Sequence, residues 1–286
     1  MLRTADKCLA VSQNRKIDMC DSKVLIWQNQ PSWHKDILDV LSDIIDDEVI
    51  NEFHSVKPEY IVSDDLSWIE DIIFNVKRIE IDLKFELFMR MQKIYSNLQA
   101  FHSSSALQVE AYYENGLRKL NVQTKSQFAK EILMNNFSDI SDEEVTDAIN
   151  NTEHETRENR VFFEANEKFL IEHCGHYLHY GSEYQVCVAA SLGDVKKTGI
   201  DYRQVFKGLG KPTVFICNVP FKYIPTKTLL ELSGSIIETI FNKIQDEHFE
   251  HPSAGDAFGF YIDRDLESEY IVSHYHPSVI RDPIVK

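Results

Sequence analysis

The order of helical and strand patterns constrains the fold of this chain more than any other feature of its sequence. Apolar residues recur at helical spacing over residues 33–49, about 65–95 and 226–245. Residues 121–158 have a polar, helical pattern, in which the acidic stretch 139–158 is either a loop or an inserted helix. Short apolar runs that predict strands lie at residues 24–27, 98–103, 160–165, 213–219, 258–262 and 269–275. Because these strands do not alternate regularly with helices, the pattern argues against a doubly wound sheet. The sequence therefore predicts an α+β fold whose first third is mostly helical.

Composition is that of an ordinary globular protein with a strongly acidic balance. Of its 286 residues, 43% are hydrophobic and 27% are charged, which suits one large domain or two modest ones. The chain has 46 acidic and 30 basic residues, for a net charge of −16. This charge disfavours non-specific binding to nucleic acid, although a local basic patch can still meet a nucleic-acid substrate. It also fits a partner with a basic surface.

Cysteine usage and hydropathy predict a cytoplasmic protein. The odd number of widely scattered cysteines favours reduced thiols over a disulfide framework. These cysteines are Cys8, Cys20, Cys174, Cys187 and Cys217. No run of about 18 apolar residues is present, which predicts no membrane-spanning helix. The first seven residues also lack the apolar core of a signal peptide.

Two carboxylates near the C-terminus are the first candidates for chemistry. Glu267 and Glu269 open a stretch whose Tyr, Ile and Val residues predict a strand that continues through Tyr275. Side chains at i and i+2 of a strand share a face, so the two carboxylates are expected to project together. Two like charges side by side cost free energy unless a cation or a developing positive charge faces them. The alternative interpretation is that both carboxylates lie at a solvated end of the strand and have no chemical role.

Two earlier stretches add polar and aromatic side chains. Residues 101–104 (FHSS) follow a short strand pattern and precede a helical pattern that ends at Gly116 and Leu117. Residues 177–182 (YLHYGS) combine two tyrosines with small residues. Taken alone, His102 fits a capped or core histidine, and Tyr177 and Tyr180 fit ordinary packing aromatics.

With the strand at residues 160–165 (RVFFEA), the ordered set resembles the ADP-ribosyltransferases of the diphtheria-toxin and poly(ADP-ribose) polymerase kind. In that family a strand with His-Gly-Thr/Ser precedes a helix ending in Gly-Leu or Gly-Ile. This helix is followed by a second strand with the pattern Gly-x-Tyr-Phe-Ala, then by a tyrosine, and last by the motif Glu-Tyr-Ile-Val. The resemblance covers about residues 96–280. It implies a split β-sheet core, with a helical region at 1–95, a catalytic domain at 96–286 and a helical insertion near 121–158.

The resemblance implies that NAD is the substrate and gives each candidate residue a role. Glu269 would face the cationic ribose that forms as nicotinamide leaves. His102 would hydrogen-bond the adenosine ribose, and the backbone of Ser103 would meet the nicotinamide amide. Tyr180, or otherwise Tyr177, would stack on the nicotinamide ring. We favour Tyr180 because Gly181 and Ser182 leave room beside it.

Further implications concern the acceptor and the biological setting. Glu267 would orient or deprotonate the acceptor, as the first Glu of Glu-x-Glu pairs does in some relatives. The acceptor is a protein side chain or a nucleic-acid group, with protein mildly favoured by the net charge. Small members of this kind are often toxins of bacterial toxin–antitoxin or phage-defence systems, which implies a neutralising antitoxin protein. No metal is expected.

This chain departs from the family pattern at two places, and two other functions compete. Ser103 replaces the family's glycine, and the tyrosines lie farther from the second strand than in the polymerases. A metal-dependent enzyme is one alternative, since His173, His176 and His179 recur at steps of three beside Cys174. The other is a non-catalytic module whose carboxylate pair binds a basic partner.

Overall fold

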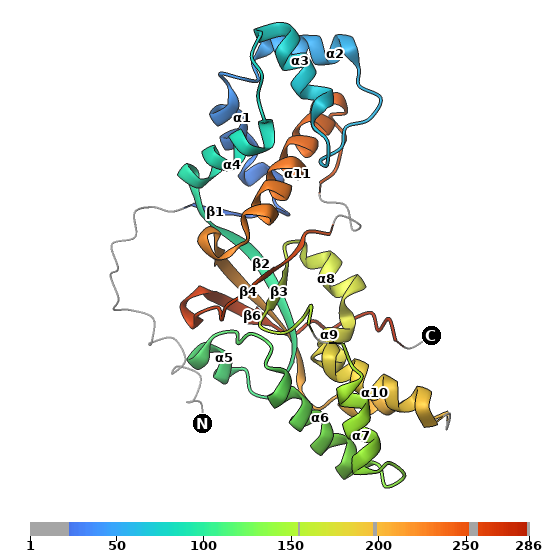
Figure 1. Cartoon of the computed structure of the whole chain (residues 1–286). Helices are drawn as coiled ribbons and strands as arrows, with labels where there is room; N and C mark the ends of the chain where they lie inside the picture. Colours follow the sequence, from blue (N-terminus) through green and yellow to red (C-terminus); the bar gives the residue numbers. More distant parts are fainter. Residues whose placement is uncertain (1–22, 154, 197–198, 252–256, 285–286) are drawn as a thin grey trace, which may run out of the picture.

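The computed structural model describes residues 23–153, 155–196, 199–251 and 257–284 (Figure 1). Cys8 and Cys20 lie outside these ranges, and the cysteines within them are free thiols: Cys174, Cys187 and Cys217. The helices of the N-terminal part are α1 (His34–Leu41), α2 (Asp47–Val56), α3 (Ser67–Lys77) and α4 (Leu83–Ile94). Among the described residues, no helix combines the length and apolar character that crossing a membrane requires.

The single helix predicted over residues 65–95 is wrong, because the chain forms α3 and α4 instead. Arg78 ends α3 in the left-handed conformation, with φ 60°. Asp82 then starts α4, its side chain accepting a hydrogen bond from the N–H of Phe85. A capping aspartate satisfies one of the unpaired N–H groups of the first turn, so this residue marks a new helix.

A six-stranded mixed sheet forms the centre of the molecule, which confirms the α+β class. The strands run in the order β5-β3-β2-β4-β6, and β1 pairs in parallel with the start of β2. Their bounds are β1 Lys23–Leu25, β2 Tyr95–Ala106, β3 Val161–Glu164, β4 Lys211–Pro220, β5 Gly259–Ile262 and β6 Ile271–Tyr275. Strands β2 and β4 pair antiparallel along their length, from Asn97 opposite Pro220 to Ala106 opposite Lys211. This long pair forms the centre of the sheet.

Helices from both halves of the sequence share the main hydrophobic core. The long helix α11 (Thr226–Gln245) packs against α4, and Figure 1 shows it among the N-terminal helices. Buried apolar residues of α1–α4, α11 and the sheet form one cluster. The N-terminal helical layer is therefore completed by a helix that follows β4.

A second core lies at the other end of the molecule (Figure 1). It is built mainly from α6 (Val122–Asn136), α7 (Asp142–Asn150) and α10 (Glu183–Lys196). Of the shorter helices, α8 (Glu167–His173) and α9 (Gly175–Tyr180) contact β2, and Figure 1 shows α5 (Glu110–Asn115) on the other side of the strands. The segment near 121–158 thus contains α6 and α7.

The last strand begins later than the sequence predicts. Glu267 precedes a 3-10 turn, η4 (Ser268–Tyr270), and β6 starts only at Ile271. Because a 3-10 helix has about three residues per turn, Glu267 and Glu269 do not share a face as they would in a strand. The predicted strand at 267–270 is therefore wrong, and the ring of Tyr270 packs edge-on against Tyr223, with centroids 5.9 Å apart.

Candidate functional site

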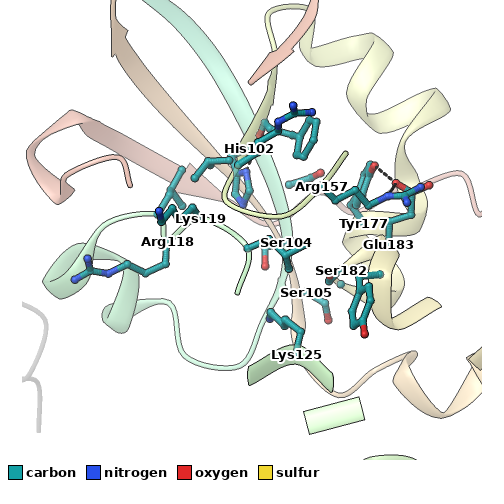
Figure 2. Close-up of a pocket in the computed structure, with 18 of the residues that line it drawn as sticks. His102, Ser104, Ser105, Arg118, Lys119, Lys125, Arg157, Tyr177, Ser182 and Glu183 are labelled. Atoms are coloured by element: carbon teal, nitrogen blue, oxygen red, sulfur yellow. Dashed lines mark hydrogen bonds and ion pairs between the residues drawn. The ribbon is translucent and has the colours of Figure 1, made fainter. Parts of the chain in front are cut away.

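A pocket of about 1380 Å³ opens beside the end of β2 (Figure 2). Residues 101–105 of β2 and 161–164 of β3 line one side of it. Helix α9 and the start of α10 line another, and the segment from α5 to α6 closes a third. The pocket therefore joins the centre of the sheet to elements that are far apart in the sequence.

The pocket opens where β2 and β3 part from each other. Their pairing is confined to Phe101 opposite Glu164, whereas β3 pairs with β5 along its whole length. Beyond Phe101, β2 continues to Ala106 and, among the described residues, is paired there only to β4. Backbone N–H and C=O groups on an unpaired strand edge can bind a ligand. The sheet thus presents a free backbone edge to the pocket.

His102 stands on this edge and is held as a neutral imidazole. Its Nδ1 lies 2.9 Å from the carbonyl oxygen of Phe162 on the diverging β3. A carbonyl can only accept, so Nδ1 donates and Nε2 keeps its lone pair as an acceptor. Burial lowers the pKa of His102, the bond to Phe162 opposes that shift, and the charge of Lys125 lowers the pKa further. His102 can therefore accept a hydrogen bond from a hydroxyl group.

Glu183 is one of two carboxylates that line the pocket with His102. Its Oε2 accepts hydrogen bonds from the hydroxyl of Tyr177, at 3.0 Å, and from Nε of Arg157, at 3.1 Å (Figure 2). Burial alone would raise the pKa of Glu183, but these two bonds lower it overall, so the carboxylate is ionised at neutral pH. Oε1 makes no hydrogen bond within the described part of the chain and remains an acceptor.

Tyr177 and Tyr180 both line the pocket, but their rings differ in how far they are exposed to a ligand. Tyr180 is only 2% exposed and belongs to the second core. Its hydroxyl donates to Asp282 at 2.8 Å and accepts from Gln204 at 3.2 Å. Tyr177 is half-buried. The structure therefore favours Tyr177 over Tyr180 as the aromatic face for a ligand, against the preference drawn from the sequence.

Positive charge is concentrated in the pocket of this acidic chain. Its basic lining residues are Arg118, Lys119, Lys125, Arg157 and Arg160, and its acidic ones are Glu164 and Glu183. Glu164 is buried, which raises its pKa, and its Oε1 accepts hydrogen bonds from the backbone N–H groups of Asn166 and Phe258. The surplus of cations favours an anionic ligand.

Glu267 and Glu269 do not line this pocket. Glu269 is exposed on η4. Oε1 of Glu267 accepts hydrogen bonds from Arg264 at 2.9 Å and from Tyr223 at 3.3 Å. The turn leads into β6, which pairs with β4 at the edge of the sheet. Strands β6 and β4 lie on one side of β2, and β3 lies on the other. The structure thus brings His102, Ser103 and the two tyrosines together but leaves both of these carboxylates outside.

The histidines at 173, 176 and 179 do not converge. His173 ends α8 and stacks on Phe169, whereas His176 lies against Tyr177 and His179 beside Tyr180. Among the described residues, no group of three His, Cys, Asp or Glu side chains is placed to hold a metal ion.

Sequence reasoning did not single out Glu183, Arg157 or Lys125. Glu183 directly follows the small pair Gly181 and Ser182 and is the first residue of α10. Carboxylates are stabilised in the first turn of a helix, so the position of Glu183 is recognised once α10 is known. Lys125 and Arg157 are recognised only from their tertiary neighbours.

Comparison with protein-family models, with curated proteins and with solved structures found no match. The function of the pocket is therefore inferred from its own geometry and from the motifs that line it.

Proposed function

We propose that the chain is an NAD-dependent ADP-ribosyltransferase whose NAD site is the pocket at the parting of β2 and β3. The observation that carries the proposal is the meeting of three motif residues around an unpaired strand edge: His102, Ser103 and Tyr177. These residues come from two of the stretches on which the resemblance rests. The strand order and the divergence of β2 from β3 are compatible with the split sheet that the resemblance implies.

The nicotinamide end of NAD fits the free edge of β2. A primary carboxamide has both a donor and an acceptor, and it can pair with strand backbone as a neighbouring strand would. Ser103 lies on this edge, and its backbone supplies the partner that the resemblance assigns to it. The half-buried ring of Tyr177 then offers a surface on which the nicotinamide ring can stack.

Glu183 takes the electrostatic role that the resemblance gives to Glu269. Cleavage of the bond to nicotinamide leaves positive charge on the ribose, which a fixed carboxylate stabilises. Arg157 and Tyr177 hold Oε2 of Glu183, so this carboxylate is oriented before the substrate binds. The neutral His102 accepts a hydrogen bond from a ribose hydroxyl, and the basic lining residues attract the two phosphates.

The acceptor is a protein side chain or a nucleic-acid group. The net charge of −16 favours protein, while the basic lining of the pocket allows a local approach of nucleic acid. A role as a toxin of a toxin–antitoxin or phage-defence system, with a neutralising antitoxin protein, belongs to the same proposal.

Labelled NAD tests the proposed function. The purified protein is incubated with NAD labelled in the adenylate part and with cell lysate, and the label is then followed into protein, RNA and DNA. Transfer to one class of macromolecule, together with release of nicotinamide, supports the proposal and names the acceptor. Absence of both NAD binding and nicotinamide release would reject it.

Substitution of the two tyrosines tests which ring contacts the ligand. We expect Tyr177→Leu to weaken NAD binding roughly 5- to 100-fold, the range for loss of an aromatic stacking partner. Tyr180→Leu removes the corresponding buried ring and the hydroxyl bonded to Asp282, so it should lower the melting temperature and leave NAD affinity unchanged. Calorimetric titration and thermal melts measure both. A larger loss of NAD affinity for Tyr180→Leu than for Tyr177→Leu would restore Tyr180 as the stacking residue.

A further inference from the structure

One end of the pocket contains hydrogen-bond donors that the fold itself does not use. Gln185 is 3% exposed, lines the pocket, and its Nε2 has no hydrogen-bond partner within the described residues. The buried Oγ of Ser105, on β2, is likewise without a partner there. Buried polar groups are almost always hydrogen-bonded, so two such groups in the lining of one pocket indicate a ligand position.

The side chains of Gln185 and Ser105 both lie close to Gly181. A Cβ atom on Gly181 would lie 3.8 Å from both the Gln185 Oε1 and the Ser105 Cβ. Gly181 has φ +81° and stands just before α10, a helix of 14 residues. The first N–H groups of a helix have no partner within it and carry partial positive charge, which suits an anion.

Lys125 adds a full positive charge at this end. Figure 2 shows its side chain, from α6, on the same side of the view as Ser105 and Ser182, with His102 on the other side. Lys125 makes no ion pair or side-chain hydrogen bond with the described residues, and burial lowers its pKa. The carboxylate that starts α10, Glu183, is already bonded to Arg157. The charge of Lys125 is therefore available to a ligand.

We propose that Lys125, Ser105, Gln185 and the N-terminus of α10 form a binding subsite for a phosphate group. An ammonium group, a hydroxyl, an amide NH₂ and helix N–H groups are the donors that a phosphate binds in proteins. The phosphate comes either from the diphosphate of NAD or from a phosphate on the acceptor. This choice rests on the proposed function, whereas the subsite itself does not. Lys125 lies in α6, so the segment near 121–158 contributes a residue to this subsite.

Binding of matched ligands to Lys125→Gln tests the proposal. The probes are inorganic pyrophosphate, NAD, nicotinamide riboside, and a single-stranded oligonucleotide with and without a 5′-phosphate. We expect pyrophosphate to bind roughly 10- to 100-fold more weakly to Lys125→Gln, as loss of a charge-assisted hydrogen bond predicts. Lys227→Gln, an exposed lysine of α11 outside the pocket, is the matched control and should bind as wild type does.

The other probes identify the source of the phosphate. Weaker binding of NAD but not of nicotinamide riboside assigns the subsite to the donor. Weaker binding of only the 5′-phosphorylated oligonucleotide assigns it to the acceptor. Lys125-dependent pyrophosphate binding without any NAD cleavage would keep the subsite and reject the transferase. Equal affinity of wild type and Lys125→Gln for every phosphate probe would overturn the subsite.

Gln185→Met separates a binding role from a structural one. Methionine fills a similar volume and removes a buried amide that lacks a partner, so the melting temperature should stay the same or rise. Pyrophosphate affinity should fall at the same time. A lower melting temperature with unchanged affinity would show that Gln185 serves only the fold.

Discussion

Glu183→Gln should lower the rate of nicotinamide release from NAD by about 10²- to 10³-fold, the usual loss when one preorganised electrostatic group is removed. Glutamine keeps the shape of the side chain and an acceptor for the Tyr177 hydroxyl, but it cannot offset positive charge on the ribose. NAD affinity should change little, because the carboxylate acts mainly as the bond to nicotinamide breaks. Release of nicotinamide under saturating NAD, with a parallel binding titration, measures the two effects separately.

Glu269→Gln is the matched control for this experiment. Glu269 is exposed on η4 and does not line the pocket, so this variant should keep the rate, the affinity and the melting temperature of wild type. The reverse outcome, an inactive Glu269→Gln and an active Glu183→Gln, would return the catalytic role to the residue that the sequence resemblance indicates. Loss of activity through unfolding of Glu183→Gln is recognised by its melting temperature.

Gly116→Ala should destabilise the protein by about 3–5 kcal/mol. Gly116 has φ 76° and ψ −172°, a conformation that costs other residues about 1–3 kcal/mol. A Cβ atom there would lie 2.1 Å from the backbone oxygen of Leu266. Relief of that collision must disturb the reciprocal backbone hydrogen bonds of Leu117 and Leu266, at 2.8 and 2.9 Å, which contribute about 0.5–1.5 kcal/mol each. Denaturant unfolding measures the total.

Gly208→Ala separates backbone strain from collision. Gly208 also has a positive φ, of 83°, but no atom of the described residues beyond its chain neighbours lies within 4 Å of the position of an added Cβ. We expect this variant to lose only the strain contribution, about 1–2 kcal/mol. Equal losses for the two variants would show that the contact between Gly116 and Leu266 adds nothing to stability.

Elements with strong local signals could be predicted from the sequence. The helix predicted at 226–245 is observed as α11, Thr226–Gln245, because its apolar positions recur without a break over five turns. The apolar run at 213–219 lies within β4. Asn166 caps α8 by accepting a hydrogen bond from the N–H of Phe169, a role for which asparagine is strongly preferred.

Predictions failed where local and tertiary preferences diverge. The pattern over 65–95 keeps helical spacing across a break, so periodicity alone could not find Arg78 in the left-handed conformation. The residues after Glu267 have strand propensity, yet they form the turn η4 before β6. This turn contacts α5 and follows the isolated bridge between Leu117 and Leu266, and neither contact can be read from the local sequence.

The candidate site was only partly predictable for the same reason. His102, Ser103 and Tyr177 lie within recognisable stretches of the sequence, and the structure places them in one pocket. The role of Glu183 depends on Arg157, which is 26 residues away and contacts it only in the folded chain. Sequence alone could not show this contact.

Hydrogen–deuterium exchange with and without NAD tests the central claim most directly, since it locates the ligand on the wild-type chain. If NAD binds at the parting of β2 and β3, amides on the unpaired edge at residues 102–106 should exchange more slowly with NAD, as should those at 177–185. Peptides that cover 267–270 should be unaffected. Protection confined to 267–270, or no protection anywhere at saturating NAD, would contradict the proposed site.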